Sequence, residues 1–152
     1  MMPRNLAGAP QPGTVRLAHC LHLRLRAMLG AADLVAFVAT TDLARARDFY
    51  AGVLGLTLLA ETPVADVFDA HGTILRVTLV PEAPAAGYTV LGWVVDDIAA
   101  SVRGLSERGV TFERFDGMQQ DESGVWATPG GDQVAWFKDA DGNTLSVTQL
   151  AP

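Results

Sequence analysis

Short runs of hydrophobic residues follow one another in the same order in both halves of the chain. The run LVAFVA (residues 34–39) is rich in β-branched and aromatic residues, which is typical of a strand. The apolar positions of LARARDFYAGVLG (residues 43–55) recur at helical spacing. Three strand-like runs come next, namely LTLLAE, DVFDA and TILRVTLV. The first half therefore predicts a strand, a helix and three further strands.

The second half repeats this order. VLGWVV (residues 90–95) predicts a strand and IAASVRGLSERG (residues 98–109) a helix, and they are followed by VTFERF, QVAWFK and NTLSVTQL. Asp42 and Asp97, which are 55 residues apart, are suited to cap the amino-terminal ends of the two helices. Gly55 and Gly109 are suited to end them.

A ten-residue segment occurs twice, as DAHGTILRVT (residues 69–78) and DADGNTLSVT (residues 139–148), with six identities. Each copy holds a glycine-containing turn of the kind that joins hairpin strands. The offset grows from 55 to 70 residues because the second half carries an extra segment, GMQQDESGVWATPGG (residues 117–131). Coincidence, or a ferredoxin-like domain with unrelated hairpins, explains this order less well than duplication. We predict an α+β fold of two tandem βαβββ modules that form a curved mixed sheet around a cleft.

The first 30 residues differ in composition from the rest. Residues 1–32 contain four arginines and no acidic residue, and residues 1–14 are rich in glycine and proline. This composition also suits a transit peptide, but serine is absent. We expect residues 1–30 to be a flexible or extended tail and residues 31–152 to be the folded domain, with module one at 33–80, a linker at 81–87 and module two at 88–150.

Charge and composition exclude several classes of function. Residues 33–152 carry 7 basic and 17 acidic side chains, a net charge of −10, which disfavours binding to nucleic acid. No apolar run approaches the roughly 18 residues of a membrane span. One cysteine, Cys20, permits no internal disulfide, so we expect a cytoplasmic protein with neither nucleic-acid nor membrane partners.

Two segments carry a family resemblance. TTDLARARDFYAGVLGL and FKDADGNTLSVTQL resemble motifs of the vicinal oxygen chelate superfamily, which includes glyoxalase I, the bleomycin-resistance proteins and the extradiol dioxygenases. The resemblance covers residues 33–150 and implies the duplicated fold predicted above. It implies small-molecule chemistry or binding of several kinds and, commonly, a homodimer whose cleft lies within one chain or between chains.

The resemblance also locates the positions at which metal-dependent relatives place their ligands. In this chain those positions are Val35, Arg76, Val90 and Ser146, none of which is an imidazole or a carboxylate. A divalent ion needs about three such donors. A dication 4 Å from the arginine would be repelled by roughly 8 kcal/mol at an effective dielectric constant of 20. His71, the one histidine of the folded domain, is expected in a hairpin turn. We therefore predict no metal and no other cofactor.

Strand alternation predicts which side chains face the cleft. Val35, Phe37 and Ala39 share one face with their counterparts Val90, Gly92 and Val94, and the other strands of the cleft contribute Ile74, Arg76, Thr78, Thr144, Ser146 and Thr148. Arg76 is a candidate for holding a ligand carboxylate or phosphate, or else for an ion pair with Asp66 or Asp69. Trp93 is expected in the core. The predicted ligand-binding residues are Phe37, Arg76, Thr78, Met118, Trp126, Ser146 and Thr148.

These features favour a metal-free binding protein for a small, partly apolar molecule, and no catalytic residue is predicted. One alternative is a metal-dependent lyase, isomerase or dioxygenase of the same superfamily. A second is a cofactor-free enzyme with Arg76 as electrophile and Asp121 or Glu122 as base. Deletion of residues 119–125 is expected to change ligand choice and to leave the fold intact.

Overall fold

The computed structural model describes residues 29–83 and 86–152. The chain divides into two compact units, Met1–Asp33 and Leu34–Pro152. The described part of the first unit holds a short 3₁₀ helix, η1 (Leu29–Ala31), so the predicted tail at 1–30 lies almost wholly outside the described residues. None of the helices in the described residues combines the length and the apolar character that a membrane crossing requires. All that follows concerns the second unit.

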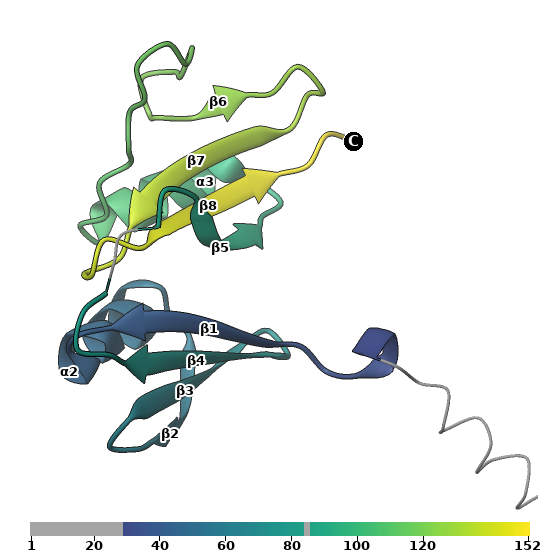
Figure 1. The fold of residues 1–152 in the computed structure, drawn as a ribbon. Coiled ribbons are helices and arrows are strands. Elements are labelled where there is room, and N and C mark those ends of the chain that lie inside the picture. Colours follow the sequence, from purple (N-terminus) through teal and green to yellow (C-terminus); the bar gives the residue numbers. More distant parts are fainter. Residues whose placement is uncertain (1–28, 84–85) are drawn as a thin grey trace, which may run out of the picture. The chain divides into compact units, whose positions relative to one another are not determined.

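Module one consists of one sheet and one helical segment (Figure 1). Its elements are β1 (Val35–Thr40), α2 (Leu43–Arg47), the π-helical η2 (Asp48–Val53), β2 (Thr57–Glu61), β3 (Ala65–Ala70) and β4 (Thr73–Leu79). The strand order is β1-β4-β3-β2, with β1 parallel to β4 and the other pairs antiparallel. This arrangement confirms the predicted strand, helix and three strands.

Module two repeats the topology. Its elements are β5 (Thr89–Val94), α3 (Ile98–Glu107), β6 (Trp126–Ala127), β7 (Gln133–Lys138) and β8 (Thr144–Gln149). The order is β5-β8-β7-β6, with β5 parallel to β8. The duplication is therefore confirmed. The predicted strand VTFERF is wrong, because Phe112 makes only an isolated bridge to Phe137, and the short β6 inside the extra segment takes its place in the sheet.

The helices begin where the sequence predicts. Asp42 Oδ1 accepts a hydrogen bond from Arg45 N at 3.1 Å, and Asp97 Oδ1 accepts one from Ala100 N at 2.8 Å. Gly55 has a φ of 76°, a conformation that glycine adopts at low cost after a helix. The first helix was expected to be α-helical throughout, but its second half, η2, is a π-helix. There the amide of Leu54 donates to the carbonyl of Phe49, five residues earlier.

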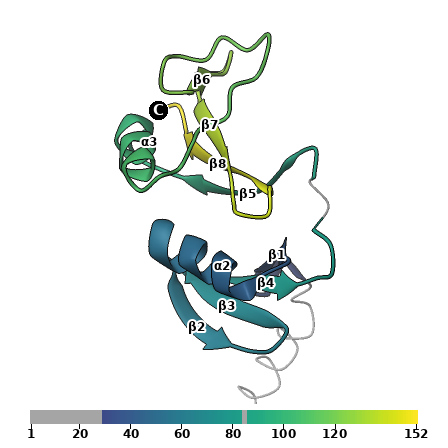
Figure 2. The same ribbon diagram turned by 90° about the vertical axis from the view of Figure 1, so that its left-hand side faces the viewer.

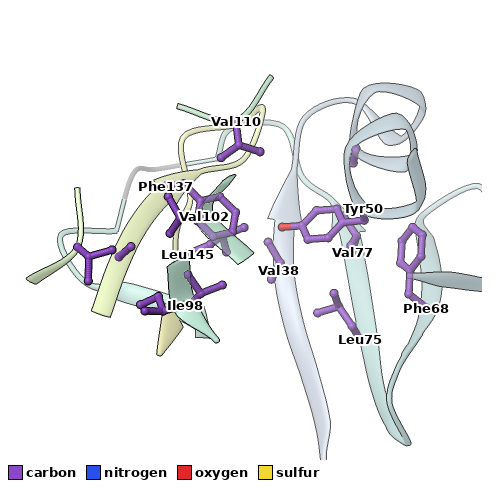
Figure 3. Close-up of a cluster of buried hydrophobic side chains, with 14 residues drawn as sticks. Val38, Tyr50, Phe68, Leu75, Val77, Ile98, Val102, Val110, Phe137 and Leu145 are labelled. Carbon is purple, nitrogen blue, oxygen red and sulfur yellow. The ribbon is translucent and has the colours of Figure 1, made fainter. Parts of the chain in front are cut away.

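One hydrophobic core joins both modules (Figure 3). Alternate residues of β4 and β7 are buried, and Figure 2 shows α2 against the sheet of module one and α3 against that of module two. Ring contacts cross between the modules, with Phe49 and Phe137 centred 6.5 Å apart. The largest fully buried side chains of the core are Tyr50, Phe68, Phe137, Leu75, Ile98, Leu145 and Val77.

A hydrogen-bond network around Asp139 also joins the modules. Asp139 is 8 % exposed, and its Oδ2 accepts from the Tyr50 hydroxyl and from Asn143 Nδ2, each at 2.7 Å. Asn143 Nδ2 also donates to the carbonyl of Ala39 at 2.9 Å. We call Tyr50, Asp139, Asn143 and the Ala39 carbonyl the inter-module network. It places the repeated DADGN turn against module one.

Because Tyr50 belongs to this network, the stability of the protein should fall at alkaline pH. Burial, and next the Asp139 charge, raise the pKa of Tyr50 well above its ordinary value. In the unfolded chain the Tyr50 phenol ionises near pH 10, whereas in the folded protein it stays neutral at that pH. The contribution of Tyr50 to the free energy of unfolding is therefore fully present below about pH 10 and is lost as the pH rises above it. Above that pH the wild-type protein should lose about 1.4 kcal/mol of unfolding free energy per pH unit through Tyr50. We expect this loss to be absent in Tyr50→Phe. Urea unfolding at pH 9–12 measures the slope. Tyr88→Phe, at a side chain 71 % exposed, is the matched control and leaves the wild-type slope.

Candidate functional site

The side chains of β1 and β4 that point away from the helical segment form one face, which we call the open face of module one. Cross-strand pairs Val35–Ile74, Phe37–Arg76 and Ala39–Thr78 build it. Phe37 is 64 % exposed, an unusual state for a large aromatic side chain. The structure thus brings Phe37, Arg76 and Thr78 of the predicted site together on one sheet.

The corresponding open face of module two is formed by β5, β8 and β7. Gly92 pairs with Ser146 and Val94 with Thr148, and Trp136 pairs with Ser146 from the other side. A β-carbon on Gly92 would lie 2.6 Å from Ser146 Oγ, so the absence of a side chain at Gly92 makes room for the buried serine.

The prediction that the side chain of Val90 faces the cleft is wrong. The register of β5 against β8 shifts between Thr89 and Leu91, so Thr89 rather than Val90 lies opposite Thr144. Val90 packs against the core instead. A β-bulge adds one residue to a strand and reverses the alternation beyond it, and nothing in the run VLGWVV marks that residue.

A cavity of about 370 Å³ lies on the open face of module two. We call it the aromatic cavity, because its walls include Tyr88, Phe115 and Trp136, beside Met118, Lys138 and Thr144. Phe115 stands edge-on to Trp136 with ring centres 5.5 Å apart, and the ring centres of Trp126 and Trp136 are 6.1 Å apart. Trp136 Nε1 donates to Thr89 Oγ1 at 3.1 Å, which fixes the indole plane.

Every described residue that lines the aromatic cavity comes from the linker or from module two. The strand register places Trp126, Ser146 and Thr148 of the predicted site on the face that holds this cavity. Of the predicted residues, Met118 lines the cavity itself. The aromatic walls Phe115 and Trp136 were not predicted. The indole could have been placed, because the β7–β8 hairpin register sets Trp136 opposite Ser146.

The loop that carries Met118 is held by side-chain to backbone bonds. Gln120 Oε1 accepts from Phe115 N at 2.8 Å, and its Nε2 donates to the carbonyls of Glu113 and Gly124. Val125 is 8 % exposed and belongs to the core. This packing does not support the expectation that residues 119–125 can be deleted without loss of the fold.

Asp121 serves this loop as a structural acceptor. Its Oδ1 accepts from Ser123 N, Ser123 Oγ and Val125 N. Partial burial pushes the pKa of Asp121 upward, but these hydrogen bonds and the charge of Arg114 outweigh it, and the pKa is lower than usual. A carboxylate held in this way is a poor general base near neutral pH.

Arg76 does not pair with either of the expected acids. Asp66 is fully buried on the helix side of the sheet and binds Arg47 through both oxygens, at 3.0 and 3.1 Å. Asp69 Oδ1 accepts from Gly72 N at 2.7 Å in the hairpin turn. Within residues 29–83 and 86–152, no carboxylate lies within 4.0 Å of the Arg76 guanidinium. The half-buried cation therefore keeps its donors for another partner.

The positions that the resemblance gives for metal ligands, Val35, Arg76, Val90 and Ser146, do not fit a divalent ion here, and Val90 packs against the core. Valine offers no donor atom, arginine is a cation, and one serine hydroxyl is a weak ligand. In the part of the chain that the structure describes, no three His, Cys, Asp or Glu side chains gather to bind a metal. His71 lies exposed in the β3–β4 turn with a φ of 54°, as predicted.

Comparison with known proteins agrees with the fold. The family model of the Glyoxalase/Bleomycin resistance protein/Dioxygenase superfamily matches residues 17–147. A superfamily member from Sphaerobacter thermophilus is 22 % identical with a TM-score of 0.63, and the match covers 81 % of this chain and all of that one. TnmS3, an antibiotic binding protein from Streptomyces sp. CB03234, is 25 % identical with a TM-score of 0.57, over 78 % and 95 % of the two chains.

Lactoylglutathione lyase from Agrobacterium tumefaciens is 20 % identical with a TM-score of 0.58, over 78 % of this chain and 93 % of that one. The comparison with curated proteins gives no match. The similar structures thus include both a binding protein and an enzyme.

Proposed function

The chain belongs to the Glyoxalase/Bleomycin resistance protein/Dioxygenase superfamily, and from this premise we propose that it is a metal-free member that binds a small, flat, partly apolar molecule. The observation that carries the proposal is the aromatic cavity on the open face of module two, beside family metal positions that offer no suitable ligands. Its volume falls within the range of small-molecule sites. Three aromatic walls favour a ring system that can stack against them.

The similarity to an antibiotic binding protein supports binding without turnover. In this proposal Trp136, Met118 and Trp126 contact the apolar part of the ligand, and Ser146 and Thr148 offer hydroxyls. Phe37, Arg76 and Thr78 complete the cleft, where Arg76 binds an acidic group on the ligand through its free donors. We propose that this occurs in the cytoplasm.

We further propose that the protein is a homodimer whose cleft is shared between chains. Phe37 and Val94 are 64 % and 68 % exposed on the two open faces, and exposed apolar faces of this kind mark interaction sites. No residue of module one lines the aromatic cavity. The open face of module one in one chain would cover that of module two in the partner, so Arg76 and Trp136 of the same chain would serve different clefts.

A mixing experiment tests this arrangement. Light scattering establishes the dimer, and calorimetry with 2-naphthoate counts sites on the full chain at neutral pH. Arg76→Met and Trp136→Leu should each weaken binding at least tenfold. After the two variants are unfolded together and refolded, half of the chains should form mixed dimers, and each mixed dimer should regain one wild-type site. A cleft within one chain regains none, and a monomer excludes the shared cleft.

The enzymatic alternatives are tested on the same preparation. The full chain is incubated with nickel, cobalt, manganese, iron or zinc, desalted and analysed for bound metal, and S-lactoylglutathione formation is measured in parallel. We expect no stoichiometric metal and no turnover. Retained metal with turnover would make the protein a lyase. Metal-free turnover that is lost in Arg76→Met would support the enzyme with a loop carboxylate as base.

A further inference from the structure

A second cavity lies on the helix side of the module-two sheet, the opposite side from the aromatic cavity. Its volume is about 360 Å³, and we call it the helix-side cavity. The buried side chains of Phe137 and Val147 line it, together with Trp93 and Leu105. Leu56, beyond η2, contributes from module one. The lining is largely aliphatic, unlike the aromatic walls of the first cavity.

Gly104 keeps the helix-side cavity open. It lies within α3 and lines the cavity, and a β-carbon built on it would meet no atom within 4 Å. Glycine inside a helix is less favourable than alanine, and neither a positive φ nor a close contact requires it here. The sequence therefore leaves space at a position where a larger residue would fit and would fill the cavity.

Among the residues that the structure describes, one charged side chain, Arg108, and no acidic side chain line this cavity. Arg108 Nη1 donates to the carbonyl of Val53 at 3.0 Å, which holds the guanidinium at the end of α3. A guanidinium has five N–H donors, so the others remain for a ligand. No described carboxylate lies within 4.0 Å of it.

We propose that the helix-side cavity is a second binding site, for an aliphatic carboxylate whose chain lies along Trp93 and Leu105 and whose head group binds Arg108. The apolar lining selects a hydrocarbon chain, and the single cation selects an acid over an alcohol or an amine. The backbone dipole at the end of α3 opposes an anion, but a direct charged hydrogen bond is stronger. This site is independent of the function proposed for the aromatic cavity.

The indole N–H groups of the three tryptophans report on the two cavities separately in ¹⁵N-correlated NMR spectra. Titration of the full chain with octanoate should shift Trp93 saturably and leave Trp126 and Trp136 in place. 1-Octanol and octylamine, which have the same chain length, should bind at least about fivefold more weakly. Shifts confined to Trp126 and Trp136, or equal affinity for octanol, would overturn the proposal. Shifts confined to Trp126 and Trp136 would place octanoate at the aromatic cavity instead, and the function proposed for that cavity is tested separately with 2-naphthoate.

Two variants with matched controls localise the site. Gly104→Leu should abolish octanoate binding, whereas Gly52→Leu should not, because Gly52 also has open space around it but does not line the cavity. Arg108→Gln should weaken octanoate binding about tenfold and leave octanol binding unchanged. Arg103→Gln removes a charge from an exposed position on the same helix and should change neither. Octanoate binding that survives both Gly104→Leu and Arg108→Gln would show that the ligand lies elsewhere.

Discussion

Replacement of Asp139 by alanine is expected to lower the free energy of unfolding by about 3–5 kcal/mol. The carboxylate accepts hydrogen bonds from the Tyr50 hydroxyl, Asn143 Nδ2, Asn143 N and Asp141 N, at 2.7 to 3.0 Å. Alanine removes the acceptor of all four bonds at a residue that is 8 % exposed, and only Asn143 Nδ2 keeps another acceptor, the carbonyl of Ala39. Each buried donor that loses its partner costs about 1–3 kcal/mol, so the loss should be a large fraction of the stability of a small domain.

Urea unfolding at neutral pH measures this loss. Asp116→Ala is the control, because Asp116 is exposed in a turn and should change stability by less than about 0.5 kcal/mol. Tyr50→Phe removes one donor and should cost about 1–2 kcal/mol. The double variant Tyr50→Phe with Asp139→Ala should be more stable than the sum of the two losses implies. A loss below 1 kcal/mol in Asp139→Ala would show that the network does not hold the modules together.

Periodicity and caps predicted the fold because each feature is local. Asp42 and Asp97 bind amides three residues ahead, and the alternation in β1 and β4 follows from strand geometry alone. The six identities between the two hairpin segments then showed that the second module repeats the first. The same alternation placed Phe37, Arg76 and Thr78 on one face, which is the observed face.

The error at VTFERF arose where a side chain replaces regular backbone pairing. VTFERF has the pattern of a strand. In the structure the side-chain amide of Gln120 bonds to the N–H of Phe115 and to the carbonyl of Glu113, which a neighbouring strand would otherwise use. The partner of Asp66 is an arginine 19 residues earlier, on the helix. Phe115 is the last residue of VTFERF and lies in a loop in the structure, so strand alternation could not have placed it beside Trp136.

The substitution Trp136→Leu is expected to weaken binding of 2-naphthoate to the aromatic cavity by about 10- to 100-fold, since the loss of a stacking aromatic costs roughly 1–3 kcal/mol. Trp136 touches both Phe115 and Trp126, and leucine keeps apolar volume at this position without a flat surface. Trp93→Phe is the matched control, because Trp93 packs on the helix side and should leave affinity for 2-naphthoate unchanged.

Calorimetry of variants that remain folded by circular dichroism separates lost binding from lost stability. Phe115→Leu removes the edge-on contact with Trp136 and should weaken 2-naphthoate less than Trp136→Leu does. The indole would then be the stacking surface, and Phe115 the residue that orients it. If Trp136→Leu binds 2-naphthoate as tightly as wild type while Arg76→Met does not, the ligand lies on the open face of module one, and the aromatic cavity is not the binding site.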